Sequence, residues 1–202
     1  MEYSHLLTER LSLDAVTHDD LDQVHALQAD PQVWRHLPAG RHDTRERTAA
    51  YIASIERGWA ADGLGYWAIR PGRGQGGSLP GGILLGVGGC TVRHDAMWNL
   101  YYRFSPAAQG HGFAAEMVKA ACDAAADLRP DLPLVASVLA HNRSSQATAL
   151  RAGLEQVWRG PDPGNPDVSA VRLIYADRPL SDGLIETLTG LKLGVADPAG
   201  PA

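Results

Sequence analysis

The chain has 202 residues, 45% of them apolar and 20% charged, which is the composition of a soluble globular domain long enough to bury one core. Its formal net charge of −5 argues against nucleic acid as the main partner and is compatible with a cationic substrate. The first residues hold no apolar run long enough for a signal peptide or a membrane span, so we expect a cytoplasmic protein without a membrane partner.

The first half of the sequence predicts alternating strands and helices. Strands are expected at 9–16, 66–70 and 83–92, with helices from Thr17 to Asp30-Pro31 and from Asp43-Thr44 to Gly63. Leu11 and Leu13 alternate with polar neighbours, as in a half-buried strand, and Thr17 is a typical N-cap. The glycine-rich segment 71–82 can bury little, and both a substrate lid and a tolerated insertion are compatible with it.

The second half continues this alternation. Strands are expected at 98–104, 134–140, 154–159 and 169–176, with helices at 112–127 and 143–152. All these elements together predict a mixed α/β (α+β) layer fold with about seven strands, in a single domain over residues 1–180. Beyond Ser181 we expect one short helix and then a disordered end. Cys90 and Cys122 lack the spacing of a disulfide framework or a zinc site, so we expect buried reduced thiols and no metal.

The segment Gln109-Gly110-His111-Gly112-Phe113-Ala114 joins a predicted strand to a predicted helix. Its glycines allow the backbone to approach a ligand closely, and the free amide groups at the start of the helix could hold a pyrophosphate. A turn without any ligand explains the glycines equally well. A dinucleotide-binding fingerprint needs a third glycine where Ala115 stands, and a P-loop needs a GK[ST] sequence that this chain lacks.

Two motifs make the sequence similar to the GNAT superfamily of N-acetyltransferases. The first, [QR]-x-x-G-x-[GA], is matched by Gln109, Gly112 and Ala114. The second, N-x-x-S followed by G-[FL] after a short helix, is matched by Asn142, Ser145, Gly153 and Leu154. Further similarity comes from Thr8-Glu9-Arg10-Leu11, Asp30-Pro31, Gly88-Gly89 and Ser105-Pro106. From residue 8 to about 176 the chain resembles the ribosomal-protein N-terminal acetyltransferases of the RimJ/RimL-like branch.

The resemblance implies a GNAT fold and a site for acetyl-coenzyme A. In that fold strands 98–104 and 134–140, the fourth and fifth, run parallel and splay apart. The pantetheine arm would pair with the main chain near Tyr102 and Phe104, with Asn142 and Ser145 beside it. The pyrophosphate would rest on amide groups of the turn, from Gln109, Gly110, His111, Gly112, Phe113, Ala114 and Ala115. Arg151 could reach a phosphate on the adenosine side, or it could be a solvated surface charge.

The resemblance also implies direct attack of a neutral amine on the thioester. Many members place a tyrosine acid seven residues after the asparagine, but Ala149 stands there in this chain. Ser145 could donate a proton to the leaving sulfur, or it could cap the following helix. Asn99 stands at the position where relatives have a glutamate base, and its amide is a poor proton acceptor. His141 is another candidate base.

The acceptor is left open by the sequence. An α-amine has a pKa of about 8 and a lysine about 10.4, so a site without a strong base favours an α-amine or another weakly basic amine. A module that binds acyl-coenzyme A without turnover, and an unrelated nucleotide-phosphate protein, are the alternatives. A homodimer is a further expectation, because relatives often dimerise. Some aromatic residues could line an acceptor pocket or belong to the core: Trp34, Tyr51, Trp59, Trp67 and Trp98.

Overall fold

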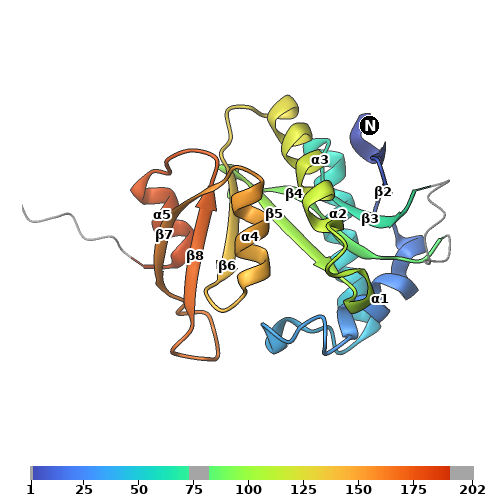
Figure 1. Ribbon diagram of the computed structural model, residues 1–202, viewed down its shortest axis with the longest axis horizontal. Coiled ribbons are helices and arrows are strands. Elements are labelled where there is room, and N and C mark those ends of the chain that lie inside the picture. The colour runs from blue at the N-terminus through green and yellow to red at the C-terminus, as the bar shows by residue number, and fades with distance from the viewer. Residues whose placement is uncertain (1, 73–81, 192–202) are drawn as a thin grey trace, which may run out of the picture.

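The computed structural model describes residues 2–72 and 82–191, in which strands and helices intermix along the chain (Figure 1). The described strands are β1 (His5–Leu7), β2 (Leu11–Ala15), β3 (Tyr66–Pro71), β4 (Gly86–Arg93), β5 (Met97–Phe104), β6 (Leu134–Leu139), β7 (Glu155–Pro161) and β8 (Val171–Ala176). The described α-helices are α1 (Leu21–Ala29), α2 (Arg45–Asp62), α3 (Phe113–Leu128), α4 (Arg143–Arg151) and α5 (Asp182–Thr189). Each predicted helix and strand is present, with its ends shifted by a few residues. The predicted loop 71–82 and the chain end lie largely outside the described residues.

The strands form one open sheet. In the described part of the chain it has eight strands in the order β1-β2-β3-β4-β5-β6-β8-β7. Each neighbouring pair is antiparallel except β5 and β6, which are parallel. The predicted mixed sheet is therefore confirmed, with one strand more than expected. That strand is β1, whose three residues are too few to show a period in the sequence.

Helices cover both faces of this sheet (Figure 1). A Cβ built on Gly88 of β4 would lie 2.8 Å from the methyl group of Met117, so this face of β4 meets α3. Thr91 of the same strand lies against Gly58 of α2. Because residues an odd number apart on a strand point to opposite faces, α2 and α3 lie on opposite faces of the sheet.

The parallel pair β5 and β6 separates soon after it begins. Only Trp98 with Leu134 and Asn99 with Val135 are paired between these two strands. Beyond that point β6 pairs with β8 as far as Leu139, whereas β5 continues to Phe104 beside β4. The splay predicted between these strands is confirmed, and it leaves a wedge that is open toward the carboxyl end of β5.

The core confirms the interpretation of several aromatic residues as structural. Trp59, Trp67 and Trp98 are almost fully buried in it. On the face that does not carry α3 and α4, Leu184 and Leu188 of α5 pack against a second apolar cluster formed by Met97, Val135, Ile174 and Ala176. Both cysteines are free thiols, as predicted. None of the helices in the described ranges is apolar and long enough to cross a bilayer.

Candidate active site

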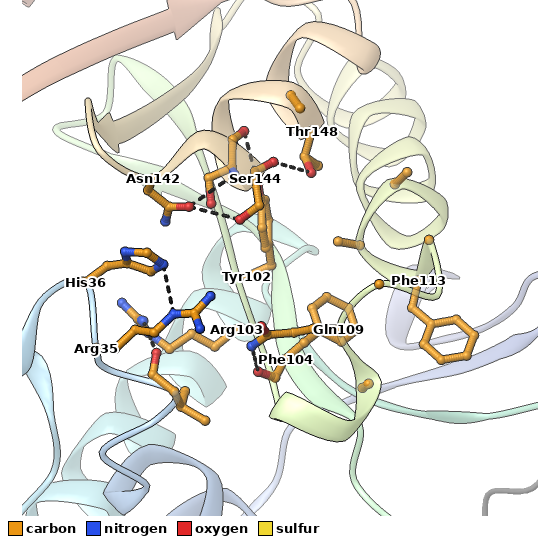
Figure 2. Close-up of a pocket in the computed structure, with 18 of the residues that line it drawn as sticks. Arg35, His36, Tyr102, Arg103, Phe104, Gln109, Phe113, Asn142, Ser144 and Thr148 are labelled. Atoms are coloured by element: carbon orange, nitrogen blue, oxygen red, sulfur yellow. Dashed lines mark hydrogen bonds between the residues drawn. The ribbon is translucent and has the colours of Figure 1, made fainter.

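The divergence of β5 and β6 is accompanied by a cavity of about 570 Å³. Its walls come from the end of β5, the turn before α3, the start of α4 and the loop after α1. Figure 2 shows Asn142, Ser144 and Thr148 of α4 and its cap gathered beside Tyr102. Most of the residues predicted to bind a cofactor line this cavity: Tyr102, Phe104, Gln109, Gly110, Gly112, Phe113, Ala114, Ala115, Asn142, Ser145 and Arg151.

The turn before α3 presents main-chain groups at one end of the cavity. Gly110 and Gly112 have φ angles of 82° and 79°, in the left-handed region that residues with a side chain avoid. Gly112 is the N-cap of α3, and the first N–H groups after a cap have no partner within the helix. The Nε2 of Gln109 donates to the carbonyl of Phe104 at 3.1 Å, which ties the turn to the end of β5. The arrangement suits an anionic ligand.

A partly buried ion pair fastens the same turn to the N-terminal part of the chain. The carboxylate of Glu116, in the first turn of α3, accepts hydrogen bonds from the main-chain N–H and the Nε of Arg10, both at 2.7 Å. Arg10 Nη1 also donates to the carbonyl of His111 at 2.8 Å. Burial works to raise the pKa of Glu116, but hydrogen bonds from Thr8 and Arg10 outweigh it and hold this pKa below its ordinary value. The charged pair therefore persists at neutral pH.

The first residues of α4 and the residue before them form a hydrogen-bonded N-cap. Asn142 is the N-cap, and its side-chain oxygen accepts from the Ser145 N–H at 3.2 Å and from the Ser144 hydroxyl at 3.0 Å. The capping role that the sequence left open for Ser145 therefore belongs to Asn142. The Tyr102 hydroxyl donates to the Ser145 carbonyl at 3.4 Å, and burial raises the pKa of this tyrosine.

A second, smaller cavity of about 170 Å³ adjoins the first. The two share five lining residues, which are His36, Tyr102, Arg103, Asn142 and Ser145. The smaller one continues between the diverging strands, where Tyr101 lines it from β5 and Val138 from β6. Ser145 thus lies where the larger cavity, lined by the turn before α3, meets the smaller one, an arrangement suited to two substrates that react at their junction.

The sequence matches the model of a protein family described as the acetyltransferase (GNAT) domain over residues 10–155. The chain belongs to the GNAT acetyltransferase family. Its splayed sheet and the cavity beside the splay are in keeping with that membership.

Solved GNAT structures share the fold at low sequence identity. A putative GnaT-family acetyltransferase from Bordetella pertussis is 20% identical with a TM-score of 0.70, and the match covers 86% of this chain and 99% of that one. RimL, a ribosomal L7/L12 alpha-N-protein acetyltransferase in complex with coenzyme A, is 17% identical with a TM-score of 0.68 over 85% and 95% of the chains. The microcin C7 self-immunity acetyltransferase MccE, in complex with acetyl-CoA and AMP, is 15% identical with a TM-score of 0.66 over 84% and 92%. Comparison with curated protein sequences gave no match.

One wall of this GNAT site has no counterpart among the residues predicted from the sequence. Gln32, Val33, Arg35 and His36, from the segment between α1 and α2, all line the larger cavity. Figure 2 shows Arg35 and His36 on this wall. Arg35 Nε donates to the Nε2 of His36 at 3.2 Å, and burial, followed by the neighbouring cations, lowers the pKa of His36. This segment has no motif or period, so nothing in the sequence tied it to the glycine turn far along the chain.

Three residues predicted for the site lie outside both cavities. His111 contributes its carbonyl to Arg10 and stacks its ring on Phe113 with centroids 5.6 Å apart. His141 lies next to His36, with ring centroids 5.4 Å apart. Asn99 lies at the apex of the wedge, where its Nδ2 donates to the Tyr66 hydroxyl at 3.3 Å. Among the described residues, no group of three or more His, Cys, Asp and Glu side chains could hold a metal ion.

Proposed function

We propose that the protein transfers the acetyl group of acetyl-coenzyme A to a primary amine, either a protein N-terminal α-amine or a small-molecule amine. The observation that carries this proposal is the wedge between β5 and β6, with main-chain amides at the start of α3 and Ser145 where the two cavities meet. RimL and MccE, which share the fold, are described in complex with coenzyme A and acetyl-CoA. We place the chain in the RimJ/RimL-like branch on the two sequence motifs.

The cofactor would run along the larger cavity. Because β6 has left β5, the main chain near Tyr102 and Phe104 can pair with the amides of the pantetheine arm, as an added strand would. The pyrophosphate would be held by N–H groups between Gln109 and Ala115, so His111 would contribute its main chain only. Asn142 would contact the pantetheine, and Arg151 lies on the wall where a phosphate on the adenosine side would fit.

The reaction would be a direct displacement. The neutral amine attacks the thioester carbonyl, a C–N bond forms, the C–S bond breaks, and coenzyme A leaves as a thiol. Ser145 donates its proton to the sulfur and regains one from solvent, since it lies where the two cavities meet. The proton lost by the amine passes to water or to His141. Asn99 supports the apex and takes no proton.

A second candidate function is binding of acyl-coenzyme A without turnover. It is favoured by Ala149 and Asn99, which occupy the positions where many relatives have a tyrosine acid and a glutamate base. Release of free thiol from acetyl-coenzyme A in the presence of a panel of peptides and small amines separates the two candidates. We expect amine-dependent release with at least one acceptor. Tight cofactor binding with no release for any amine would favour the binding module.

A further inference from the structure

We infer that the acceptor is an amine that also carries an anionic group, a carboxylate or a phosphate, and that Arg103 binds this group. The inference rests on the proposed acetyl transfer and narrows its acceptor class. It starts from the position of Arg103, the only arginine that lines both cavities among the described residues.

The guanidinium of Arg103 is held in a fixed position before any ligand arrives. Its carbon lies 3.4 Å from the centroid of the Trp34 ring, which is buried beneath it. Its Nη1 donates to the carbonyl of Val33 at 3.1 Å and its Nε to the hydroxyl of Tyr101 at 3.1 Å. The other terminal nitrogen has no partner within residues 2–72 and 82–191. A positioned guanidinium with a free N–H edge loses little conformational freedom when it binds an oxyanion.

The positive charge of Arg103 is not balanced within the smaller cavity. The other charged residues that line this cavity are Asp162 and Arg172, which pair through hydrogen bonds of 2.7 and 2.9 Å and cancel one another. In the described part of the chain, no carboxylate lies within ion-pair distance of Arg103. The pKa of His36, the remaining basic residue on this wall, is lowered first by burial, which favours its neutral form. The cavity thus carries one uncompensated positive charge.

The direction of the Arg103 side chain separates it from the cofactor turn. Tyr102 points to the face covered by α3 and α4, where its hydroxyl meets Ser145. Arg103, the next residue, points to the opposite face and contacts the segment that follows α1. The glycine turn leads into α3 and serves the first face. A ligand that enters from the face of Arg103 would meet the thioester from the side opposite the cofactor phosphates.

The charge also suits the chemistry. A cation close to the acceptor lowers the pKa of its amine, and attack requires the neutral amine. The same cation disfavours polyamines and other multiply charged cations. An acceptor with a carboxylate or phosphate near its amine compensates Arg103 and is oriented by it.

Matched acceptors that differ in charge test the inference. The pairs are alanine with alaninamide, 2-aminoethyl phosphate with ethanolamine, and the peptide Ala-Asp-Ala-amide with Ala-Asn-Ala-amide. For each pair, the preference is the kcat/KM of the anionic member divided by the kcat/KM of its matched partner. For at least one pair we expect this preference to be about ten- to a hundredfold larger in the wild-type protein than in Arg103→Met, as for a charge-assisted hydrogen bond. The pair that responds identifies the source of the anion. Arg151→Met, on the cofactor side, should weaken acetyl-coenzyme A without changing this preference.

Product binding gives a second readout that does not need turnover. In the presence of coenzyme A, calorimetry should show N-acetylalanine, or the N-acetylated form of another anionic acceptor, binding more tightly than its uncharged partner, and Arg103→Met should remove the difference. Unchanged affinity of Arg103→Met for acetyl-coenzyme A shows that the variant is folded. Equal preference in wild type and Arg103→Met, or a variant that loses only acetyl-coenzyme A affinity, would overturn the inference. Failure of acetyl-coenzyme A itself to bind would instead overturn the proposed function.

Discussion

Asn99 of β5 and Val135 of β6 are the last paired residues between the two parallel strands. From Leu100 onward the side of β5 that faces β6 has no strand partner, so its main-chain groups are available to another extended chain. This single change in pairing creates the wedge, and both cavities lie along it. The proposed cofactor site depends on that change in pairing.

Replacement of Gly112 by alanine tests the glycine turn. Its φ of 79° costs a residue with a Cβ about 1–2 kcal/mol, so we expect a lower unfolding free energy. We also expect the affinity for acetyl-coenzyme A to fall about tenfold, because the amide groups of the turn shift. Gly190→Ala is the matched control: φ there is 69° at the end of α5, outside both cavities. It should cost similar stability and leave the affinity unchanged, and equal effects on affinity would contradict the prediction.

Glu116→Gln tests the bond between this turn and the N-terminal part of the chain. The folded-state pKa of Glu116 is lowered, so its charged form contributes stability above its ordinary pKa of 4.5, and this is lost as the pH falls through the folded pKa. We expect the variant to lose about 1–3 kcal/mol at pH 7, measured by urea unfolding, and the gap from wild type to close in acid. Glu155→Gln, at an exposed position, should show no such gap. A gap that is the same at both pH values contradicts this role.

Arg172→Met tests the ion pair in the smaller cavity. Asp162 is 6% exposed, and without Arg172 its carboxylate would be buried and unpaired. We expect a loss of about 2–4 kcal/mol in unfolding free energy, and partial recovery in the double variant Asp162→Asn, Arg172→Met. Lys119→Met removes the exposed partner of Asp123 and should leave the unfolding free energy almost unchanged. Similar losses of unfolding free energy for Arg172→Met and Lys119→Met would contradict the prediction, because burial of the ion pair would then have no effect on stability.

The two cysteines should be unreactive in the native protein. Burial raises the pKa of the Cys90 thiol well above its usual value, and burial followed by nearby carboxylates raises the pKa of Cys122 to about 11. At pH 8 roughly one Cys122 in a thousand would be a thiolate. We expect slow labelling by a disulfide reagent until denaturant is added, which leaves the thiol-release assay free of background. Fast labelling of either cysteine without denaturant would be evidence against this burial.

Ser145→Ala tests the proposed proton donor. Loss of a general acid typically costs about a hundredfold in kcat, and we expect this with little change in KM for acetyl-coenzyme A. Ser144→Ala is the control, because the Ser144 hydroxyl donates to Asn142 and lines the larger cavity only. It should keep kcat within a few-fold of wild type. A Ser145→Ala enzyme with unchanged kcat would remove Ser145 from the mechanism.

The sequence predicted what depends on local pattern. Alternating leucines, the helix start near Asp43-Thr44 and the helix end at Gly63 follow from short-range rules, and the structure has them. The glycine turn was found from its residues and its place between a strand and a helix, and Asn142 through the resemblance to the GNAT motifs. The sequence did not indicate Arg103, Arg35 or His36. These residues lie together because the segment after α1 packs over β5, and such a long-range contact leaves no local signal in the sequence.

The central claim is that the wedge and the glycine turn bind acetyl-coenzyme A. Calorimetric titration with acetyl-coenzyme A tests this claim most directly, with ATP and NAD, which also contain linked phosphate groups, as comparison ligands. We expect one acetyl-coenzyme A to bind per chain, with an affinity that Gly112→Ala lowers, and much weaker binding of ATP and NAD. Binding of ATP or NAD with no measurable binding of acetyl-coenzyme A would contradict the claim.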